Sequence, residues 1–362
     1  MYHFNPPKVI EAEVFMRLPD YLRRDKAADL TPWARQQHPG VPVAAFLEGP
    51  SFDRDSNLYC VDIAHGRIFR TTPAGEVSVV TEYDGEPNGL KIHKDGRIFV
   101  ADYKNGIVNI DPATGKVTPL LERAWLERFR GVNDLTFASN GNLYFTDQGQ
   151  TGMHDPTGCV YRLRANGQLD LILDNVPSPN GLVLNAHENV LYLAVTRQNC
   201  VWRVRLLPDG TVTKVGVFLR LSGGLAGPDG LALNEEEGLT IAHAGYGIVW
   251  NLQSPWRSRD RSALARRNLY HQCRLRRSRP PRSLHHRILH CMHPACARRR
   301  TRPADVLAHV RLYFVVVASR LRKHCCAYSP GDRTSTVLTK SGYGNSYRFP
   351  HFFSSTVASS IS

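Results

Sequence analysis

The sequence predicts an all-β fold of the β-propeller class, and two observations between residues 43 and 250 support this prediction. Five apolar segments each begin at an Asn, Asp or Glu, and their first residues lie 40, 45, 47 and 49 positions apart. A second apolar run ends 14 or 15 positions after each of these first residues. Tandem four-stranded units of 40 to 50 residues are typical of propeller blades.

The repeats have a constant register. They begin at Glu48, Asn88, Asn133, Asn180 and Asp229. Their second runs end at Asp62, Asp102, Asp147, Val195 and His243. Turn-forming pairs separate the runs, at 95–96, 140–141, 166–167 and 209–210, and such Asp-Gly and Asn-Gly pairs favour tight hairpins. Each unit is therefore expected to be a four-stranded antiparallel meander. An ordinary β-sandwich would not explain the constant register.

The first residues of the repeats form a candidate metal site. The first strand of a propeller blade lines the central channel, so residues at one register form a ring. All five offer oxygen atoms, which suit a hard cation such as Ca²⁺, with Mg²⁺, Mn²⁺ or Zn²⁺ as alternatives. Glu48 and Asp229 would together neutralise a divalent ion. The alternative is that the Asn-Gly and Asp-Gly pairs only form turns before each inner strand.

Charge divides the chain into two parts. The whole sequence has 362 residues and a net charge of +14. Residues 1–250 contain 24 basic and 29 acidic side chains, whereas 251–362 contain 22 basic and three acidic ones and five of the eight cysteines. The two parts therefore need separate interpretation. We expect a propeller over 1–250 and an Arg-rich, non-homologous tail over 251–362, disordered or derived from a frameshift.

The sequence carries no sign of a membrane or secretion segment. There is no apolar run of about 18 residues, and the N-terminus lacks the charged start and apolar core of a signal peptide. Three scattered cysteines in the first 250 residues suit a reducing compartment. We therefore expect a cytoplasmic protein with no membrane partner.

Four motifs, in this order and spacing, resemble those of a known family. They are EGP at 48–50, NDL at 133–135, SPNGL at 178–182 and GPDGL at 227–231. The chain is similar over residues 8–250 to the gluconolactonase and regucalcin-like (senescence marker protein) family of six-bladed propellers. That resemblance implies metal-dependent hydrolysis of a lactone, with a small cyclic ester as the partner molecule.

The resemblance also implies roles for individual residues. Glu48, Asn180 and Asp229 match the family's metal ligands, and Asn133 matches an Asn that contacts the ion or the substrate. Arg130 is a candidate substrate-binding residue, although it lies three residues before Asn133, where the family has its Arg two residues before. Asn88, which belongs to the ring of repeat-starting residues, is a further candidate for substrate binding.

Catalysis then needs a base. The resemblance favours Asp229, which would orient and deprotonate a water beside the cation. His243 is a second candidate if its strand end reaches the channel, and a packed core histidine is the alternative. Asp134 is expected to support Asn133, and the Asp residues that end the second runs are expected to fix strand ends and tie neighbouring blades.

The sequence departs from the family in two segments. An insert over 19–42 separates a first strand, expected to complete the last blade, from blade one; it either covers a channel mouth and selects the substrate or is an inert loop. After Trp250 the repeat disappears, so blade six is missing and the ring is expected to be open. We hypothesise a frameshift or an unspliced intron, which the transcript across codons 245 to 260 tests: a cDNA in the present frame would contradict it.

Other interpretations exist for the role of the tail and for the function of the whole chain. Arginines in the tail could bind nucleic-acid phosphates, but no nucleic-acid-binding module is recognisable, so such a partner is not expected. A zinc site is the other alternative for the tail, and its candidate ligands are His290, Cys291, His293 and Cys296. For the whole chain, the competing functions are a non-catalytic propeller that binds a metal or a protein, an inactive truncated product, and a strictosidine-synthase-like relative, which would need a catalytic Glu on a late blade.

Overall fold

The computed structural model describes residues 8–12, 14–24, 29–224, 226–234 and 236–252, and the backbone of 270–275. The chain divides into two compact units, 1–325 and 326–362, and all described residues belong to the first. The tail predictions, including the zinc ligands, fall outside the described residues except for one short strand.

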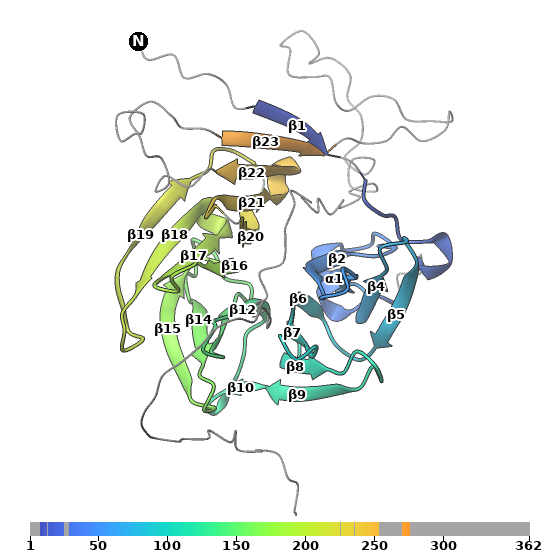
Figure 1. Cartoon of the computed structure of the whole chain (residues 1–362), viewed down its shortest axis with the longest axis horizontal. Helices are drawn as coiled ribbons and strands as arrows, with labels where there is room; N and C mark the ends of the chain where they lie inside the picture. Colours follow the sequence, from blue (N-terminus) through green and yellow to red (C-terminus); the bar gives the residue numbers. More distant parts are fainter. Residues whose placement is uncertain are drawn as a thin grey trace, which may run out of the picture. The chain divides into compact units, whose positions relative to one another are not determined.

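Five blade sheets follow one another in chain order, and four of them are antiparallel throughout (Figure 1). Blade one contains β2 (Leu47–Phe52), β3 (Leu58–Asp62), β4 (Arg67–Thr71) and β5 (Val77–Glu82). Blade two contains β6 (Pro87–Ile92), β7 (Ile98–Asp102), β8 (Gly106–Ile110) and β9 (Val117–Leu121). Blade three contains β12 (Val132–Phe137), β13 (Leu143–Asp147), β14 (Gly158–Leu163) and β15 (Leu169–Val176). Blade four contains β16 (Pro179–Leu184), β17 (Val190–Val195), β18 (Cys200–Leu206) and β19 (Val212–Arg220).

Blade five differs in its outer strands. Its own strands are β20 (Pro228–Leu233), β21 (Leu239–His243) and β22 (Ile248–Leu252). The sheet continues with β23 (Tyr270–Leu275), which pairs antiparallel with β22, and with β1 (Lys8–Ala12), which pairs parallel with β23. The N-terminal strand thus joins the last sheet, although through a strand that lies beyond the end of the repeat.

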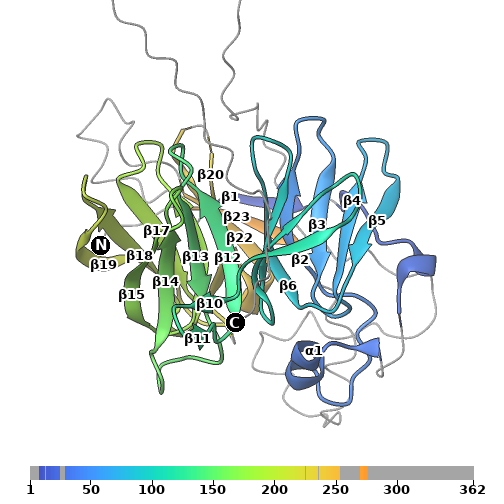
Figure 2. The same cartoon turned by 90° about the horizontal axis from the view of Figure 1, so that it is seen from below.

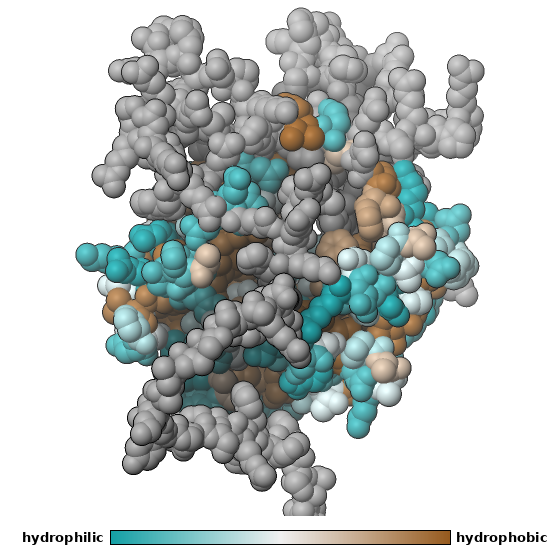
Figure 3. Space-filling model, viewed as in Figure 1, coloured by the Kyte–Doolittle hydropathy of each residue, from teal (hydrophilic) through white to brown (hydrophobic). Residues whose placement is uncertain are grey.

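Apolar clusters fill the space between successive blades. Buried side chains of blades one and two, two and three, three and four, and four and five form four separate clusters. On the face in Figure 3, hydrophilic side chains lie mostly at the outer margin of the described blades and hydrophobic ones further in. Burial of both faces of the sheets is what a propeller requires, so the predicted all-β propeller with five blades is confirmed.

Each innermost strand carries a β-bulge at its ring residue. Pairing shifts between Pro87 and Gly89 in β6 and between Pro179 and Leu182 in β16. The strands β2, β12 and β20 shift their pairing at the same place. Bulges redirect side chains. The Asn-Gly and Asp-Gly pairs therefore lie inside the strands, and the interpretation that they form turns ahead of the strands is wrong.

The glycine after the ring residue allows close contact between neighbouring inner strands. A Cβ on Gly181 would lie 2.4 Å from the Asp229 carbonyl oxygen, and one on Gly89 would lie 2.7 Å from the Asn133 carbonyl oxygen. The equivalent Gly230 in blade five has no described atom within 4 Å of such a Cβ. Among the described residues, the inner strand of blade five therefore has a neighbour on only one side.

Aspartates at the ends of the second strands fasten the segments that lead into the ring. Asp62 accepts a hydrogen bond from the Phe46 amide (2.8 Å), and Asp147 accepts one from the Gly131 amide (2.7 Å). Asp102 accepts from the Glu86 amide (3.1 Å) and also from the hydroxyl of Tyr83 (2.8 Å), which follows the last strand of blade one. The predicted role at strand ends agrees with these bonds.

The insert lies at the end of the blades where the ring residues are. It contains a 3₁₀ turn, η1 (Asp20–Leu22), and one short helix, α1 (Pro32–Gln37), which Thr31 caps by accepting from the Ala34 amide. The Thr31 hydroxyl donates to the Ile63 carbonyl (2.9 Å), directly after β3. Figure 2 shows α1 at the same end as the hairpin of β10 (Arg123–Ala124) and β11 (Glu127–Arg128). Turns η3 (Thr196–Gln198) and η4 (Ala244–Tyr246) follow the second strands of blades four and five.

The glycine contacts predict a contrast between two substitutions. Gly181→Ala should lower the free energy of unfolding by about 1–3 kcal/mol, because the new methyl group overlaps the backbone of β20. Gly230→Ala should leave it nearly unchanged. Urea unfolding of both variants provides the measurement, and an equal loss in the two would show that another segment packs on the open side of β20.

Candidate metal and catalytic site

Two carboxylates from opposite ends of the repeat array interact electrostatically at the ring. Glu48 is in the first inner strand and Asp229 in the last, and each is partly exposed. Burial raises the pKa of Glu48 well above its ordinary value, and the negative charges of Asp229 and Asp134 raise it further. A carboxyl group interacts in this way only with charges close by. The five blades therefore bring these distant residues together.

Asp229 experiences the same electrostatic environment. Burial, with a further contribution from the charge of Asp134, raises the pKa of Asp229 to about 6, and a hydrogen bond from Asn180 lowers it. Both residues are partly exposed as a whole, but burial disfavours the charged form of each carboxyl group. An additional positive charge between them would relieve this repulsion.

Asp134 is a third acidic member of the cluster, and its contacts differ from those expected. Its Oδ1 accepts from the Leu135 amide (2.8 Å) and lies 3.7 Å from Nζ of Lys91. Its charge raises the pKa of both Glu48 and Asp229. Asp134 therefore acts on the carboxylates across the ring, and no hydrogen bond among the described residues joins it to the Asn133 side chain.

The amide residues of the ring differ in exposure. Asn133 and Asn180 are buried, whereas Asn88 is partly exposed. Nδ2 of Asn133 donates to Oε1 of Gln148 at 2.9 Å, a contact that the repeat pattern did not predict. Its only sequence signal is that Gln148 directly follows the strand-ending Asp147.

The donor set fits a hard divalent cation. Within the described ranges, no three His, Cys, Asp or Glu side chains converge as a metal-binding group. The set at the ring is instead two carboxylates with raised pKa values, together with amide oxygens. This chemistry suits Ca²⁺, Mg²⁺ or Mn²⁺ better than Zn²⁺.

Arg130 and His243 lie in different surroundings. The Arg130 guanidinium donates to the Thr157 hydroxyl and is half exposed. His243 is buried, its Nδ1 accepts from Nε1 of Trp250 at 3.2 Å, and its ring packs edge-on against Tyr246. Burial lowers the pKa of His243 more than the nearby Ala226 backbone raises it. These contacts match the packed histidine that was the alternative to a base.

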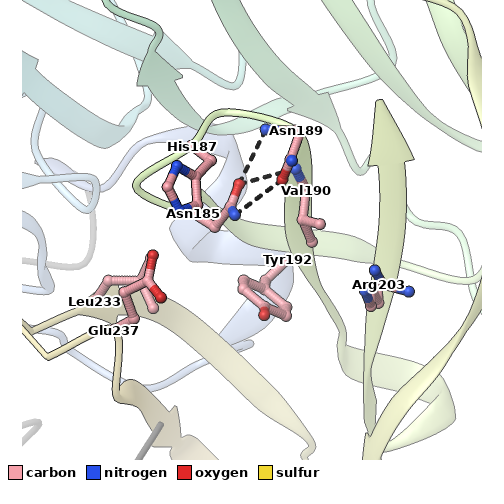
Figure 4. Close-up of a pocket in the computed structure, with 8 residues that line it drawn as sticks. All are labelled: Asn185, His187, Asn189, Val190, Tyr192, Arg203, Leu233 and Glu237. Atoms are coloured by element: carbon pink, nitrogen blue, oxygen red, sulfur yellow. Dashed lines mark hydrogen bonds between the residues drawn. The ribbon is translucent and has the colours of Figure 1, made fainter. Parts of the chain in front are cut away.

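A hollow of about 280 Å³ between blades four and five lies away from the ring (Figure 4). Its lining residues Asn185, His187 and Asn189 follow the end of β16, and Glu237 follows the end of β20. The ring residues lie at the beginning of the same strands, so the hollow is at the opposite end of the blades. It contributes nothing to the candidate site.

Comparison with known proteins identifies the family. The family model described as "SMP-30/Gluconolactonase/LRE-like region" matches residues 46–263. The chain belongs to this family. It is 30% identical over 229 residues to the lactonase drp35 of Staphylococcus aureus. This alignment covers 60% of this chain and 68% of drp35. The predicted family is thereby confirmed.

Solved structures show the same fold. A gluconolactonase from Xanthomonas campestris matches with a TM-score of 0.53 and 22% identity, over 70% of this chain and 85% of its own. A calcium-binding regucalcin from Agrobacterium tumefaciens matches with a TM-score of 0.52 and 22% identity, over 69% and 77%. In the part of the chain that is described, no helix is long and apolar enough to cross a membrane.

The raised pKa of Asp229 predicts a pH-dependent stability in the absence of a metal ion. The pKa of Asp229 is about 6 in the folded chain, against 3.8 for an ordinary Asp. Protonation of Asp229 therefore contributes fully to the free energy of unfolding below pH 3.8, and this contribution is lost as the pH rises through about 6. With a chelator present, wild-type protein should therefore lose more stability between about pH 5 and 7.5 than Asp229→Asn.

Urea midpoints at the two pH values measure this difference. Asp55→Asn, which alters an exposed turn carboxylate, serves as the control and should behave like wild type. An Asp229→Asn variant with the wild-type pH dependence would contradict the prediction.

Proposed function

We propose that this chain hydrolyses a lactone with the help of a divalent cation held at the ring. The observation that carries the proposal is the pair of carboxylates, Glu48 and Asp229, whose pKa values are raised by burial and by neighbouring negative charge. Two proteins similar to this chain, the lactonase drp35 and the Xanthomonas gluconolactonase, indicate the reaction class. The name of the calcium-binding regucalcin supports Ca²⁺ as the first ion to test.

The proposed ligands are Glu48, Asn180 and Asp229, with Asn133 at the side of the ion or the substrate. A bound cation supplies Lewis-acid chemistry, in that it polarises a lactone carbonyl and stabilises the oxyanion. Hydrogen bonding by Asn180 lowers the pKa of Asp229, so two of the proposed ligands interact in the ion-free chain. Such prior organisation lowers the entropic cost of binding.

Asp229 is the proposed base. Its carboxylate would accept a proton from a water molecule at the ring while the carbonyl carbon of the lactone is attacked. With the ion bound, its pKa would fall below the value of about 6 in the ion-free chain, which keeps Asp229 ionised and ready to accept. The proton then passes to the alkoxide released by ring opening, so the product is a hydroxy acid.

Asn88, Asn133 and Arg130 are the proposed substrate-binding residues, and they differ in how readily each could contact a substrate. Asn88 and Asn133 are in inner strands at the ring register. The guanidinium of Arg130 is engaged by Thr157 and lies 3.9 Å from Asp155, so it would have to exchange these contacts to reach a bound molecule. We therefore place the amides ahead of Arg130 as substrate ligands.

A non-catalytic role remains the second candidate, because blade five has a neighbour on only one side among the described residues. Such a protein would hold a cation at the ring without turning over any lactone. The lactone hydrolysis assay described next separates the two functions.

A lactonase assay tests the proposal. The full-length chain is given a panel of γ- and δ-lactones, and hydrolysis is monitored through the protons that it releases. We expect turnover that is lost with a chelator and restored by Ca²⁺, Mg²⁺ or Mn²⁺, and that falls by at least about 100-fold in Asp229→Ala. Asp111→Ala, on an exposed turn of blade two, should keep its activity. Tight ion binding with no turnover of any lactone would favour the non-catalytic role.

A further inference from the structure

Gln148 makes hydrogen bonds with both ends of its side-chain amide. Its Oε1 accepts from Nδ2 of Asn133 at 2.9 Å, and its Nε2 donates to Oγ of Ser178 at 3.0 Å. Ser178 precedes the ring residue Asn180 by two positions. One side chain therefore connects the inner strand of blade three with the segment that leads into blade four.

The backbone around Gln148 is fixed as well. Its amide donates to the Gly131 carbonyl (2.9 Å), and its carbonyl accepts from the Thr151 hydroxyl (2.7 Å). The Thr151 hydroxyl in turn accepts a hydrogen bond from the backbone amide of Ser178 (3.1 Å). Ser178 is buried and has a positive φ of 64°. Gln148 thus occupies a defined place from which its amide can determine the orientation of Asn133.

The amide of Asn133 has two unlike ends, so fixing one end fixes the other. With Nδ2 bound to Gln148, Oδ1 is directed away from Gln148. Within the described part of the chain, no group donates a hydrogen bond to Oδ1 of Asn133. The carbonyl oxygen is therefore left available for a ligand at the ring.

No other blade has an equivalent of Gln148. The residue after the second strand is Ile63, Tyr103, Thr196 or Ala244 in blades one, two, four and five. None of these side chains carries an amide that could bind the ring residue and the next blade at once. The contact is particular to blades three and four, which supply two of the proposed ligands.

We propose that Gln148 is a positioning residue for the cation site: it directs Oδ1 of Asn133 toward the ring and fixes the spacing between Asn133 and Asn180. This inference rests on the proposed cation-dependent function. Gln148 does not itself touch the ion. Loss of a residue that orients a ligand commonly weakens metal affinity by about 10- to 100-fold.

Calcium titration calorimetry on the full-length chain tests this role. Gln148→Met keeps the size of the side chain but removes both polar atoms, and we expect a 10- to 100-fold weaker affinity for Ca²⁺. Gln148→Glu keeps an acceptor for Nδ2 of Asn133 and should recover the affinity. Gln168→Met, on an exposed turn of the same blade, is the matched control and should bind like wild type.

A second variant covers the case in which Gln148→Met does not fold. Ser178→Gly suits the positive φ of this position and removes the hydroxyl that holds Nε2 of Gln148, so it should weaken Ca²⁺ binding by a smaller factor. Wild-type affinity in the folded Gln148→Met variant, or in Ser178→Gly where Gln148→Met does not fold, would overturn the positioning role alone. Absence of Ca²⁺ binding and of lactone turnover in wild type would instead overturn the proposed function together with it.

Discussion

The convergence of negative charge at the ring is the physical constraint on which the site depends. Glu48, Asp134 and Asp229 come from three blades, and their charges act on one another in surroundings that disfavour ionisation. Folding alone would not favour such an arrangement, because like charges held together raise the free energy of the native state. A cation that binds only the folded chain compensates for this cost.

Two features of the inner strands produce this convergence. The bulge at the ring register redirects the side chain, and the glycine that follows lets the next inner strand approach to a distance that a Cβ would prevent. Strand-ending aspartates such as Asp62 and Asp147 then hold the segments that lead into each bulge. The bulge recurs in all five blades, and the closely packed glycine recurs in blades one, two and four. In blade three the residue after Asn133 is Asp134, so that position adds charge to the ring.

The sequence predicts much of this arrangement because the repeat is regular. The period of 40 to 49 residues and the turn signals predict the sheets, and the constant register predicts which side chains share the ring. The bulges were missed, since Asn-Gly and Asp-Gly are also typical of turns. Gln148 was missed because a single amide outside the repeat register gives no periodic signal, and its role depends on contacts between blades.

Blade five shows where local pattern is insufficient. Its three strands follow the repeat, but the strands that extend its sheet come from 8–12 and 270–275, a pairing that depends on segments distant in sequence. Gly230 retains the glycine that its counterparts use for close packing, although no described atom lies beside it. The position is thus built like the others but lacks their neighbour.

The position of a bound ion would show whether Glu48, Asn180 and Asp229 form a cation site. Anomalous diffraction from crystals of the full-length protein soaked in Mn²⁺ would locate the ion without reference to activity. We expect one strong peak within coordination distance, about 2.0–2.6 Å, of carboxylate or amide oxygens of Glu48, Asn180 and Asp229. A peak elsewhere, or none at the ring in crystals whose Glu48 and Asp229 side chains are ordered, would contradict this expectation.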